Sequence, residues 1–191
     1  MRNQEPPLLP ERWSGAYVSY WSPMQEDDQL TSGFCWFDYG RNICRIDGLF
    51  NPWSEEKTGY RLWMSEIGDA ARGRTFKRKV AYAREREADG VRLHDALLDD
   101  ELGPFAELFL PRDLLTRHET EAVEPAVVLG VEAEGWRCAR PGKGPITLYF
   151  QAGTDRLLRM VTESERGRVS VRDFPNLQTG PIGEEVFQLG G

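Results

Sequence analysis

The stretch YRLWMSE at residues 60–66 has the alternation that decides the fold. On a β-strand, successive side chains point to opposite faces, so Tyr60, Leu62 and Met64 share one face with Glu66. Large apolar and aromatic side chains at every second position predict a strand with one buried face.

Similar segments, rich in aromatic and β-branched residues, recur at short intervals with turn residues between them, which predicts a meandering antiparallel sheet. The predicted strands are residues 15–21, 33–39, 42–50, 59–66, 76–84, 105–110, 126–138, 146–151, 156–162 and 168–173. Helical signals are local: a helix start at 111–115 and one or two turns within 93–102. Residues 67–75 fit either a loop or a short helix. The predicted class is mainly β (α+β), a curved antiparallel sheet or half-barrel with a few short helices.

Length and charge favour one compact domain without a nucleic-acid or membrane partner. The chain has 191 residues, which suits a single core over residues 1–191, with an extended Pro-rich N-terminus at 1–10 and a weakly defined tail at 176–191. Its formal net charge is −7, which disfavours binding to nucleic acid or anionic membranes. No run approaches the roughly 18 apolar residues of a membrane span. The N-terminus lacks the apolar region of a secretory signal, so we expect a cytoplasmic location.

Metal ligands are sparse, whereas aromatic side chains are abundant. The chain has two His, at positions 94 and 118, and three Cys without C-x-x-C spacing, so we expect no metal site. It also has six Trp, six Tyr and nine Phe. This composition favours a binding site with flat apolar walls.

Glu66 is the first candidate for chemistry. A carboxyl group that shares a strand face with large apolar side chains is partly desolvated, which favours its protonated form and suits a general acid or base. The alternative is that Glu66 marks the end of a strand, where the chain emerges into water before Gly68.

Other polar residues lie at positions where a sheet can present them. Tyr17 and Ser19 share a strand face that places hydroxyl groups among aromatic rings. Arg172 alternates with valines, so it faces either solvent or a cavity, where its planar fork suits a carboxylate. Asn51 precedes Pro52 and can place its amide at the mouth of the sheet, or form a plain turn.

A basic run over residues 72–92 contains eight Lys and Arg residues. Apolar and acidic residues interrupt it, so a solvated strand face or a charged edge fits better than a nucleic-acid surface.

Long strings of the sequence resemble the VioE family of violacein-biosynthesis enzymes. They are residues 8–10, 16–24, 27–33, 46–54, 58–66, 103–113, 140–145 and 158–162. The resemblance covers nearly the whole chain and weakens within 86–100, within 116–125 and after 175. Those stretches contain none of the candidate site residues.

The resemblance implies a cofactor-free enzyme, a homodimer, with a fold like the lipoprotein carriers. Enzymes of this kind act on the indole-3-pyruvate imine dimer that upstream enzymes make from L-tryptophan. They promote a 1,2 shift of one indole ring, which gives the protodeoxyviolaceinate skeleton, whereas the dimer otherwise drains into a chromopyrrolate-type shunt. The family's site positions are matched by Tyr17, Ser19, Phe50, Asn51, Glu66 and Arg172, and the resemblance adds Pro52 and Met160 as lining residues.

Residue chemistry and resemblance together assign a role to each position. Glu66 is the expected acid and base, Arg172 the anchor for a carboxylate, and Phe50 an apolar wall. Tyr17, Ser19 and Asn51 are expected to hold the conformer that rearranges. Two alternatives stay open: a non-enzymatic carrier or chaperone of an apolar ligand on the same curved sheet, and a structural partner that only shields the intermediate.

Overall fold

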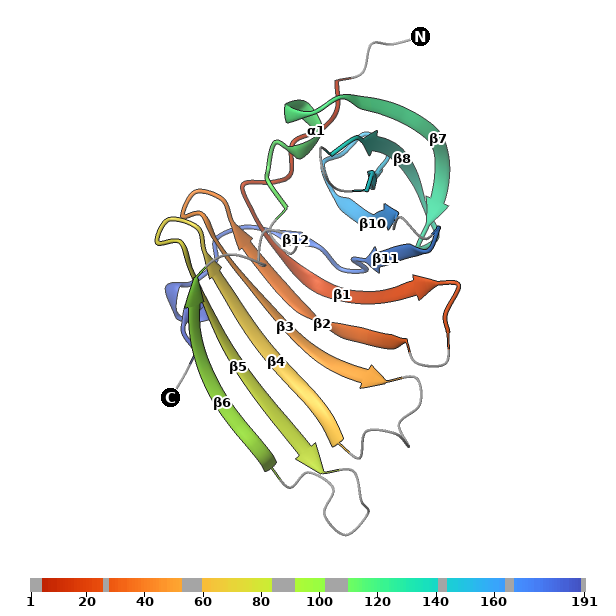
Figure 1. Ribbon diagram of the computed structural model, residues 1–191. Helices are drawn as coiled ribbons and strands as arrows, with labels where there is room; N and C mark the ends of the chain where they lie inside the picture. The colour runs from red at the N-terminus through yellow and green to blue at the C-terminus, as the bar shows by residue number, and fades with distance from the viewer. Residues whose placement is uncertain are drawn as a thin grey trace.

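The computed structural model describes residues 5–25, 28–52, 60–83, 92–101, 110–140, 144–163 and 167–189. They form a curved antiparallel sheet with little helix (Figure 1). The strands are β1 Arg12–Ser22, β2 Gln29–Asp38, β3 Ile43–Pro52, β4 Tyr60–Asp69, β5 Arg74–Ala83, β6 Arg92–Glu101, β7 Thr120–Val128, β8 Val131–Cys138, β9 Ile146–Gln151, β10 Leu157–Glu163, β11 Val169–Asp173 and β12 Gln178–Thr179. The helices are α1 Leu114–Arg117 and the 3-10 helix η3 Glu184–Phe187.

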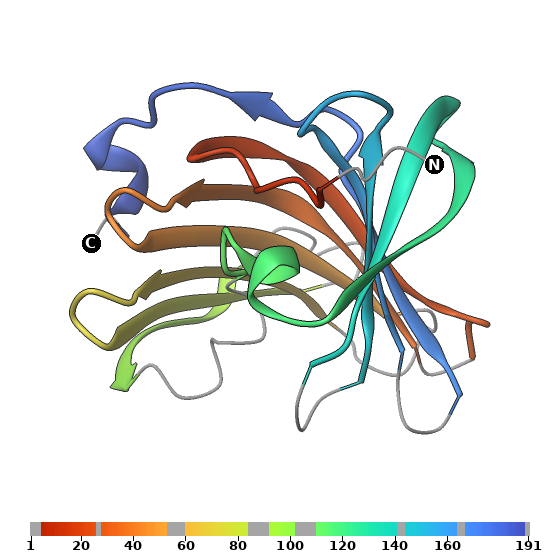
Figure 2. The ribbon, with the colours of Figure 1, turned by 90° about the horizontal axis from the view of Figure 1, so that it is seen from above.

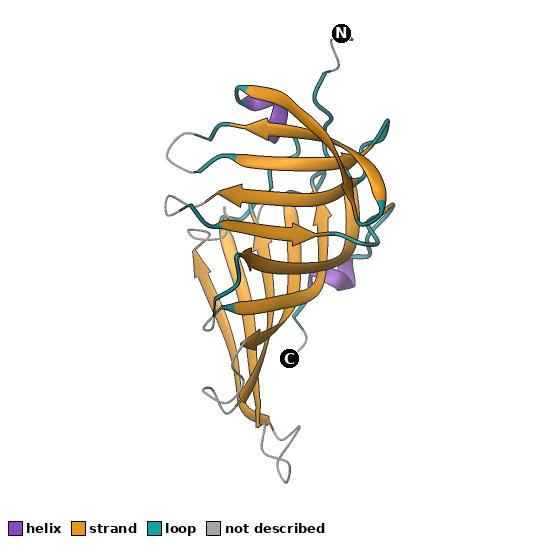
Figure 3. Ribbon diagram, turned by 90° about the vertical axis from the view of Figure 1, so that its right-hand side faces the viewer, coloured by secondary structure: helices purple, strands orange, loops and turns teal. Residues whose placement is uncertain are grey.

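The sheet consists of two meanders that meet at the first strand of the chain. The strand order is β6-β5-β4-β3-β2-β1-β11-β10-β9-β8-β7, and β12 pairs with β1 outside this path. Neighbours within each meander are joined by antiparallel hairpins, which need only short connections. Figure 3 shows the strands as a continuous curved wall. The predicted mainly β class with a curved antiparallel sheet is confirmed.

Three local predictions need correction or fall outside the described residues. Residues 93–101 do not form the predicted helical turns, because 92–101 are the edge strand β6 paired with β5, and position 102 lies outside the described residues. Residues 126–138 are not one strand: Leu129 and Gly130, with φ of 52° and 77°, form a turn between β7 and β8. The predicted strand at 105–110 lies outside the described residues except at position 110.

The uncertain stretch 67–75 is a hairpin. β4 continues to Asp69 and β5 begins at Arg74, so four residues connect the strands. Of the predicted helices, the start at 111–115 leads into the single turn of α1.

The main core packs against part of the inner face of the sheet, defined here as the face that packs on α1. Trp13, Phe37 and Leu148 from the strands belong to the same buried cluster as Leu114 and Leu115 of α1. Figure 2, seen from above, shows α1 in the angle between the two meanders. Trp13 stacks on Phe37 with ring centroids 4.4 Å apart. The aromatic excess therefore serves the core to a large extent.

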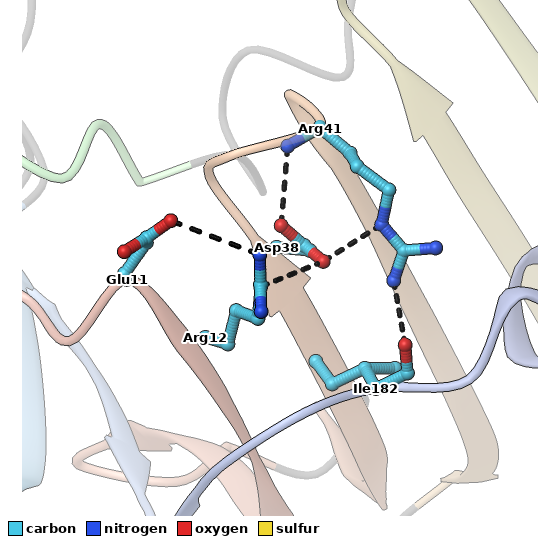
Figure 4. A network of polar contacts seen from close by, with 5 residues as sticks. All are labelled: Glu11, Arg12, Asp38, Arg41 and Ile182. Carbon is cyan, nitrogen blue, oxygen red and sulfur yellow. Dashed lines mark hydrogen bonds and ion pairs between the residues drawn. The ribbon is translucent and has the colours of Figure 1, made fainter.

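The C-terminal segment is tied to the outer face by hydrogen bonds from two arginines. Arg45 alternates with the inner-face residues Cys44 and Ile46, and its Nη1 donates to the carbonyl of Val186 at 2.7 Å. Arg41 Nη2 donates to the carbonyl of Ile182 at 2.7 Å (Figure 4). Guanidinium donors thus bind backbone carbonyls that the segment cannot satisfy internally.

Candidate functional site

The cross-strand register brings predicted residues from distant parts of the chain to the inner face. In antiparallel pairing, directly opposite residues share a face of the sheet. Arg172 lies opposite both Ser19 and Met160. Tyr17 lies two residues before Ser19 on β1 and begins a second cross-strand row. This row continues through Gly33, Gly48, Met64 and Lys79 on successive strands.

The neighbouring rows hold further predicted positions. Phe50 lies opposite Thr31, which is itself opposite Ser19. On the other side of the Tyr17 row, Glu66 lies opposite Ile46 and Lys77. Tyr17, Ser19, Phe50, Glu66, Met160 and Arg172 therefore occupy inner-face positions of five strands.

Phe50, Asn51 and Pro52 are described by their backbone only. They are the last three residues of β3, so the strand does not end at 50 as predicted. Asn51 lies opposite Leu30, and by alternation it takes the other face from Phe50. The roles of these three residues stay predictions.

Tyr17 is buried at the centre of the candidate site. Tyr17 is 3% exposed, and a Cβ placed on Gly48 would lie 2.5 Å from the Tyr17 hydroxyl oxygen. Burial raises the pKa of Tyr17 to about 12, the charge of Arg172 lowers it in part, and the charge of Glu66 adds to the rise. The phenol is therefore a neutral hydrogen-bond donor throughout the ordinary pH range.

Arg172 lies over the ring of Tyr17. Its Cζ is 5.1 Å from the ring centroid, a cation–π distance. Burial lowers the pKa of Arg172, while the nearby Tyr17 and Cys35 partly oppose that effect. Its Nε is buried without a hydrogen-bond partner, and no carboxylate of the described residues forms an ion pair with it. A buried donor of this kind is costly unless it is satisfied, so the geometry suits an incoming anion.

Glu66 lies inside the sheet and not at a strand end. The residue is 4% exposed, and β4 continues for three residues beyond it. The alternative in which the chain emerges into water at Glu66 is therefore wrong. The predicted apolar surroundings are also incomplete, because Lys77 Nζ lies 2.8 Å from Glu66 Oε1.

Met160 and Ser19 differ in their access to the open part of this face. Met160 is 9% exposed and belongs to the main core cluster, so it lies on the core side of the candidate site. Exposure increases along β1, from the buried Trp13 and Tyr17 to the half-buried Ser19 and Trp21. The candidate site thus lies where the packed core gives way to the accessible part of the inner face.

Lys77 was not predicted, because the basic run was interpreted as one solvated strand face or charged edge. The register divides that run: Lys77 and Lys79 take inner-face positions, whereas Arg74 and Arg78 take the outer face. A usable signal was present, because a four-residue connection between 60–69 and 74–83 places Glu66 opposite Lys77.

A second missed feature lies at the rim next to the Ser19 and Arg172 pair. Trp21 is opposite Ser170, and the Cζ of Arg168 is 4.9 Å from the Trp21 ring centroid. Arg168 also pairs with Asp28, and this hydrogen bond lowers the pKa of the Asp28 carboxyl. The Arg168–Asp28 pair thus links the loop between β1 and β2 to the start of β11.

A cavity of about 530 Å³ lies elsewhere, beside the β2–β3 turn. Its lining includes Leu8, Tyr39 and Arg112 but none of the predicted site residues. Within the described residues, no three His, Cys, Asp or Glu side chains gather as a metal site. None of the helices in the described ranges is long and apolar enough to span a membrane.

A comparison with protein families identifies one family across most of the chain. The model for "Violacein biosynthetic enzyme VioE" matches residues 6–187. No curated protein matches the sequence significantly.

Solved structures with a similar fold come from several bacteria. An uncharacterized conserved protein from Thermus thermophilus is 12% identical with a TM-score of 0.51, over 96% of this chain and 87% of that one. The MucA/MucB complex of Pseudomonas aeruginosa gives 19% identity and a TM-score of 0.46, over 94% of this chain. This chain covers only 56% of that one. A LolA superfamily protein from Nitrosomonas europaea gives 6% identity and a TM-score of 0.36, over 96% and 92% of the two chains.

Proposed function

This chain belongs to the VioE family of violacein biosynthetic enzymes, and from that premise we propose that Arg172, Tyr17 and Glu66 form the working part of its site. The VioE step converts the indole-3-pyruvate imine dimer to the protodeoxyviolaceinate skeleton by a 1,2 shift of one indole ring. Its substrate therefore offers flat aromatic rings and carboxylates, and its competing reaction is a spontaneous shunt.

The observation that carries the proposal is the buried, unpaired Nε of Arg172 beside Tyr17. A guanidinium without a carboxylate partner among the described residues favours binding of an anionic substrate. Arg172 would hold one substrate carboxylate, while the Tyr17 ring on the other side keeps the guanidinium in place. Ser19, directly opposite on β1, is close enough in register to add a hydroxyl contact.

Conformer selection accounts for much of the proposed catalysis. Because the shunt proceeds without help, the enzyme must hold the dimer in the geometry that rearranges and keep the shunt geometry inaccessible. Tyr17 supplies a neutral donor and an apolar ring at the centre of the face. Phe50 and Met160 are proposed as walls, with Asn51 and Pro52 at the end of β3.

Glu66 is the proposed acid and base. Moving the ring to the adjacent carbon requires a proton to be removed at one position of the substrate and returned at another. Glu66 takes this role because it is a buried carboxyl group on the same face as Tyr17, and its charge contributes to the raised pKa of the Tyr17 phenol. We propose that no cofactor takes part.

The test supplies the upstream enzymes and L-tryptophan and quantifies rearranged and shunt products by mass spectrometry. Arg172→Gln should shift the products toward the shunt by about tenfold or more, because a lost charged hydrogen bond costs about 1.5–3 kcal/mol. Arg172→Lys should recover only part of the yield, since an ammonium lacks the planar fork. Full rearrangement by Arg172→Gln would overturn the anchor role.

A carrier or chaperone of an apolar ligand is the second candidate, because the curved sheet alone does not fix a function. The enzyme changes the product distribution at substoichiometric amounts, whereas a carrier binds one ligand per chain and leaves its mass unchanged. A homodimer, contact with the upstream enzyme and a cytoplasmic location complete the proposal. Sedimentation velocity tests the first of these directly.

A further inference from the structure

The ion pair between Lys77 and Glu66 is a feature of the inner face that the proposed function leaves unexplained. Lys77 Nζ lies 2.8 Å from Glu66 Oε1, and the two side chains are 22% and 5% exposed. The residues are directly opposite on β5 and β4. For Glu66, no other ion pair is present among the residues that the structure describes.

The surroundings of this pair argue against a purely stabilising role. The buried Ile46 and Cys35 follow Glu66 in the same cross-strand row, and the next row holds Met64 and Tyr17. A buried ion pair loses hydration on folding, and apolar residues of similar volume often stabilise a protein as well or better. The pair nevertheless lies on the inner face, where the charge of Glu66 adds to the raised pKa of Tyr17.

We propose that Lys77 is a positioning residue that holds the carboxyl group of Glu66 in place for its work on the substrate. The ammonium binds Oε1, which fixes the orientation of the carboxyl group and leaves Oε2 free of this contact. The other oxygen, Oε2, then takes a proton from a substrate carbon and later returns it to another, so the rearrangement consumes no net proton. This inference rests on the proposed acid and base role of Glu66.

Lys79 provides a matched control on the same strand. It is two residues from Lys77, takes the same face, and lies opposite Met64 instead of a carboxylate. Both lysines are half-buried. Because each carries one positive charge, removal of either changes the net charge of the face by the same amount. Of these two lysines, Lys77 is the one that forms an ion pair with Glu66.

The experiment measures the initial rate of rearranged product with the upstream enzymes and L-tryptophan. Lys77→Met should lower the rate by about tenfold or more, a part of the roughly 10²–10⁴ that acid–base catalysis supplies. Lys77→Arg should restore a large share of it, and Lys79→Met should stay within about twofold of the parent. Lys77→Met added to Glu66→Gln should cause no further loss, because Lys77 acts through that carboxylate.

The outcomes separate this inference from the proposed function. If Glu66→Gln is inactive and Lys77→Met is fully active, the Lys77 role is wrong and Glu66 keeps its role. If Glu66→Gln is fully active, the acid and base assignment fails and the Lys77 role fails with it. An additional loss in the double variant also overturns the inference. Thermal unfolding checks that each variant folds, and Lys77→Gln replaces Lys77→Met if the latter does not.

Discussion

A glycine makes room for the central tyrosine of the candidate site. Gly33 and Gly48 are directly opposite each other on β2 and β3, in the same cross-strand row as Tyr17 of β1. A Cβ on Gly33 would meet the backbone of Asp47, whereas a Cβ on Gly48 would meet the Tyr17 hydroxyl. The absence of a Cβ at position 48 therefore determines where the hydroxyl is held.

Gly48→Ala tests this arrangement. The new Cβ would lie 2.5 Å from the Tyr17 hydroxyl oxygen, so the phenol must move. We expect a stability loss of about 1–3 kcal/mol from overpacking and a several-fold fall in rearranged product. Urea unfolding and the product assay measure the two effects. In a Tyr17→Phe background the hydroxyl is gone and the stability loss should shrink, whereas an equal loss in both backgrounds would contradict the contact.

The residue-scale predictions succeeded where alternation along one strand was enough. Alternation alone places Tyr17 with Ser19, and the structure agrees. It does not reveal that Arg172 lies beside Ser19, because that depends on the long-range pairing of β1 with β11. Without a register, the partner of Glu66 is also hidden unless the short connection between 60–69 and 74–83 is recognised as a hairpin.

At the scale of elements, the β2–β3 turn is held by Asp38 (Figure 4). This carboxylate, 1% exposed, accepts hydrogen bonds from the Arg41 backbone N–H at 3.1 Å and from Arg41 Nε at 2.7 Å. Arg12 Nε of β1 lies 3.3 Å away. Burial raises the pKa of Asp38, but the hydrogen bonds and charges of Arg41, with the charge of Arg12, outweigh it and lower the pKa.

Asp38→Asn is expected to lower the free energy of unfolding by about 1–3 kcal/mol at neutral pH, since both arginines are partly exposed. Because the pKa is lowered on folding, the carboxylate stabilises the fold at pH values above the ordinary Asp pKa of about 3.9. This contribution disappears as the pH falls through the lower pKa of the folded state. The gap between parent and variant should therefore close below about pH 4. Urea unfolding at pH 7 and pH 3 measures it, and a gap of equal size at both would contradict the role of the charge.

The wrong predictions of two elements have physical explanations. Leu93 and Leu97 have a helical spacing, but pairing with β5 makes this segment a strand, since strand formation depends on its neighbours more than on local preference. The β7–β8 turn was hidden in the apolar run 126–131, because Leu129 adopts a positive φ that sequence patterns assign to Gly or Asn.

At the scale of the whole molecule, one core joins the two meanders. Trp13 and Phe37 of the first meander belong to the same buried cluster as Trp136 and Leu148 of the second, and Leu115 of α1 is part of it. Apart from this cluster, β1–β11 pairing is the main connection of the sheet. A shared core predicts that both meanders unfold together.

Leu115→Ala tests this cooperativity. Leu115 is 3% exposed, and its truncation should cost about 2–4 kcal/mol through lost burial and the cavity left behind. Leu8→Ala is the matched control, because Leu8 is 43% exposed and should cost about 0.5 kcal/mol or less. Circular dichroism and tryptophan fluorescence should report one shared urea transition in the variant. Two separate transitions would show that the meanders unfold independently.

The central place of β1 has a consequence for the order of events during synthesis. β1 can pair with β2 as soon as both strands have been made, but its other edge must wait for residues 169–173. Until then the growing chain exposes an unpaired strand edge, which favours aggregation. Since Arg172 belongs to that later strand, the first meander can be folded while the candidate site is still incomplete.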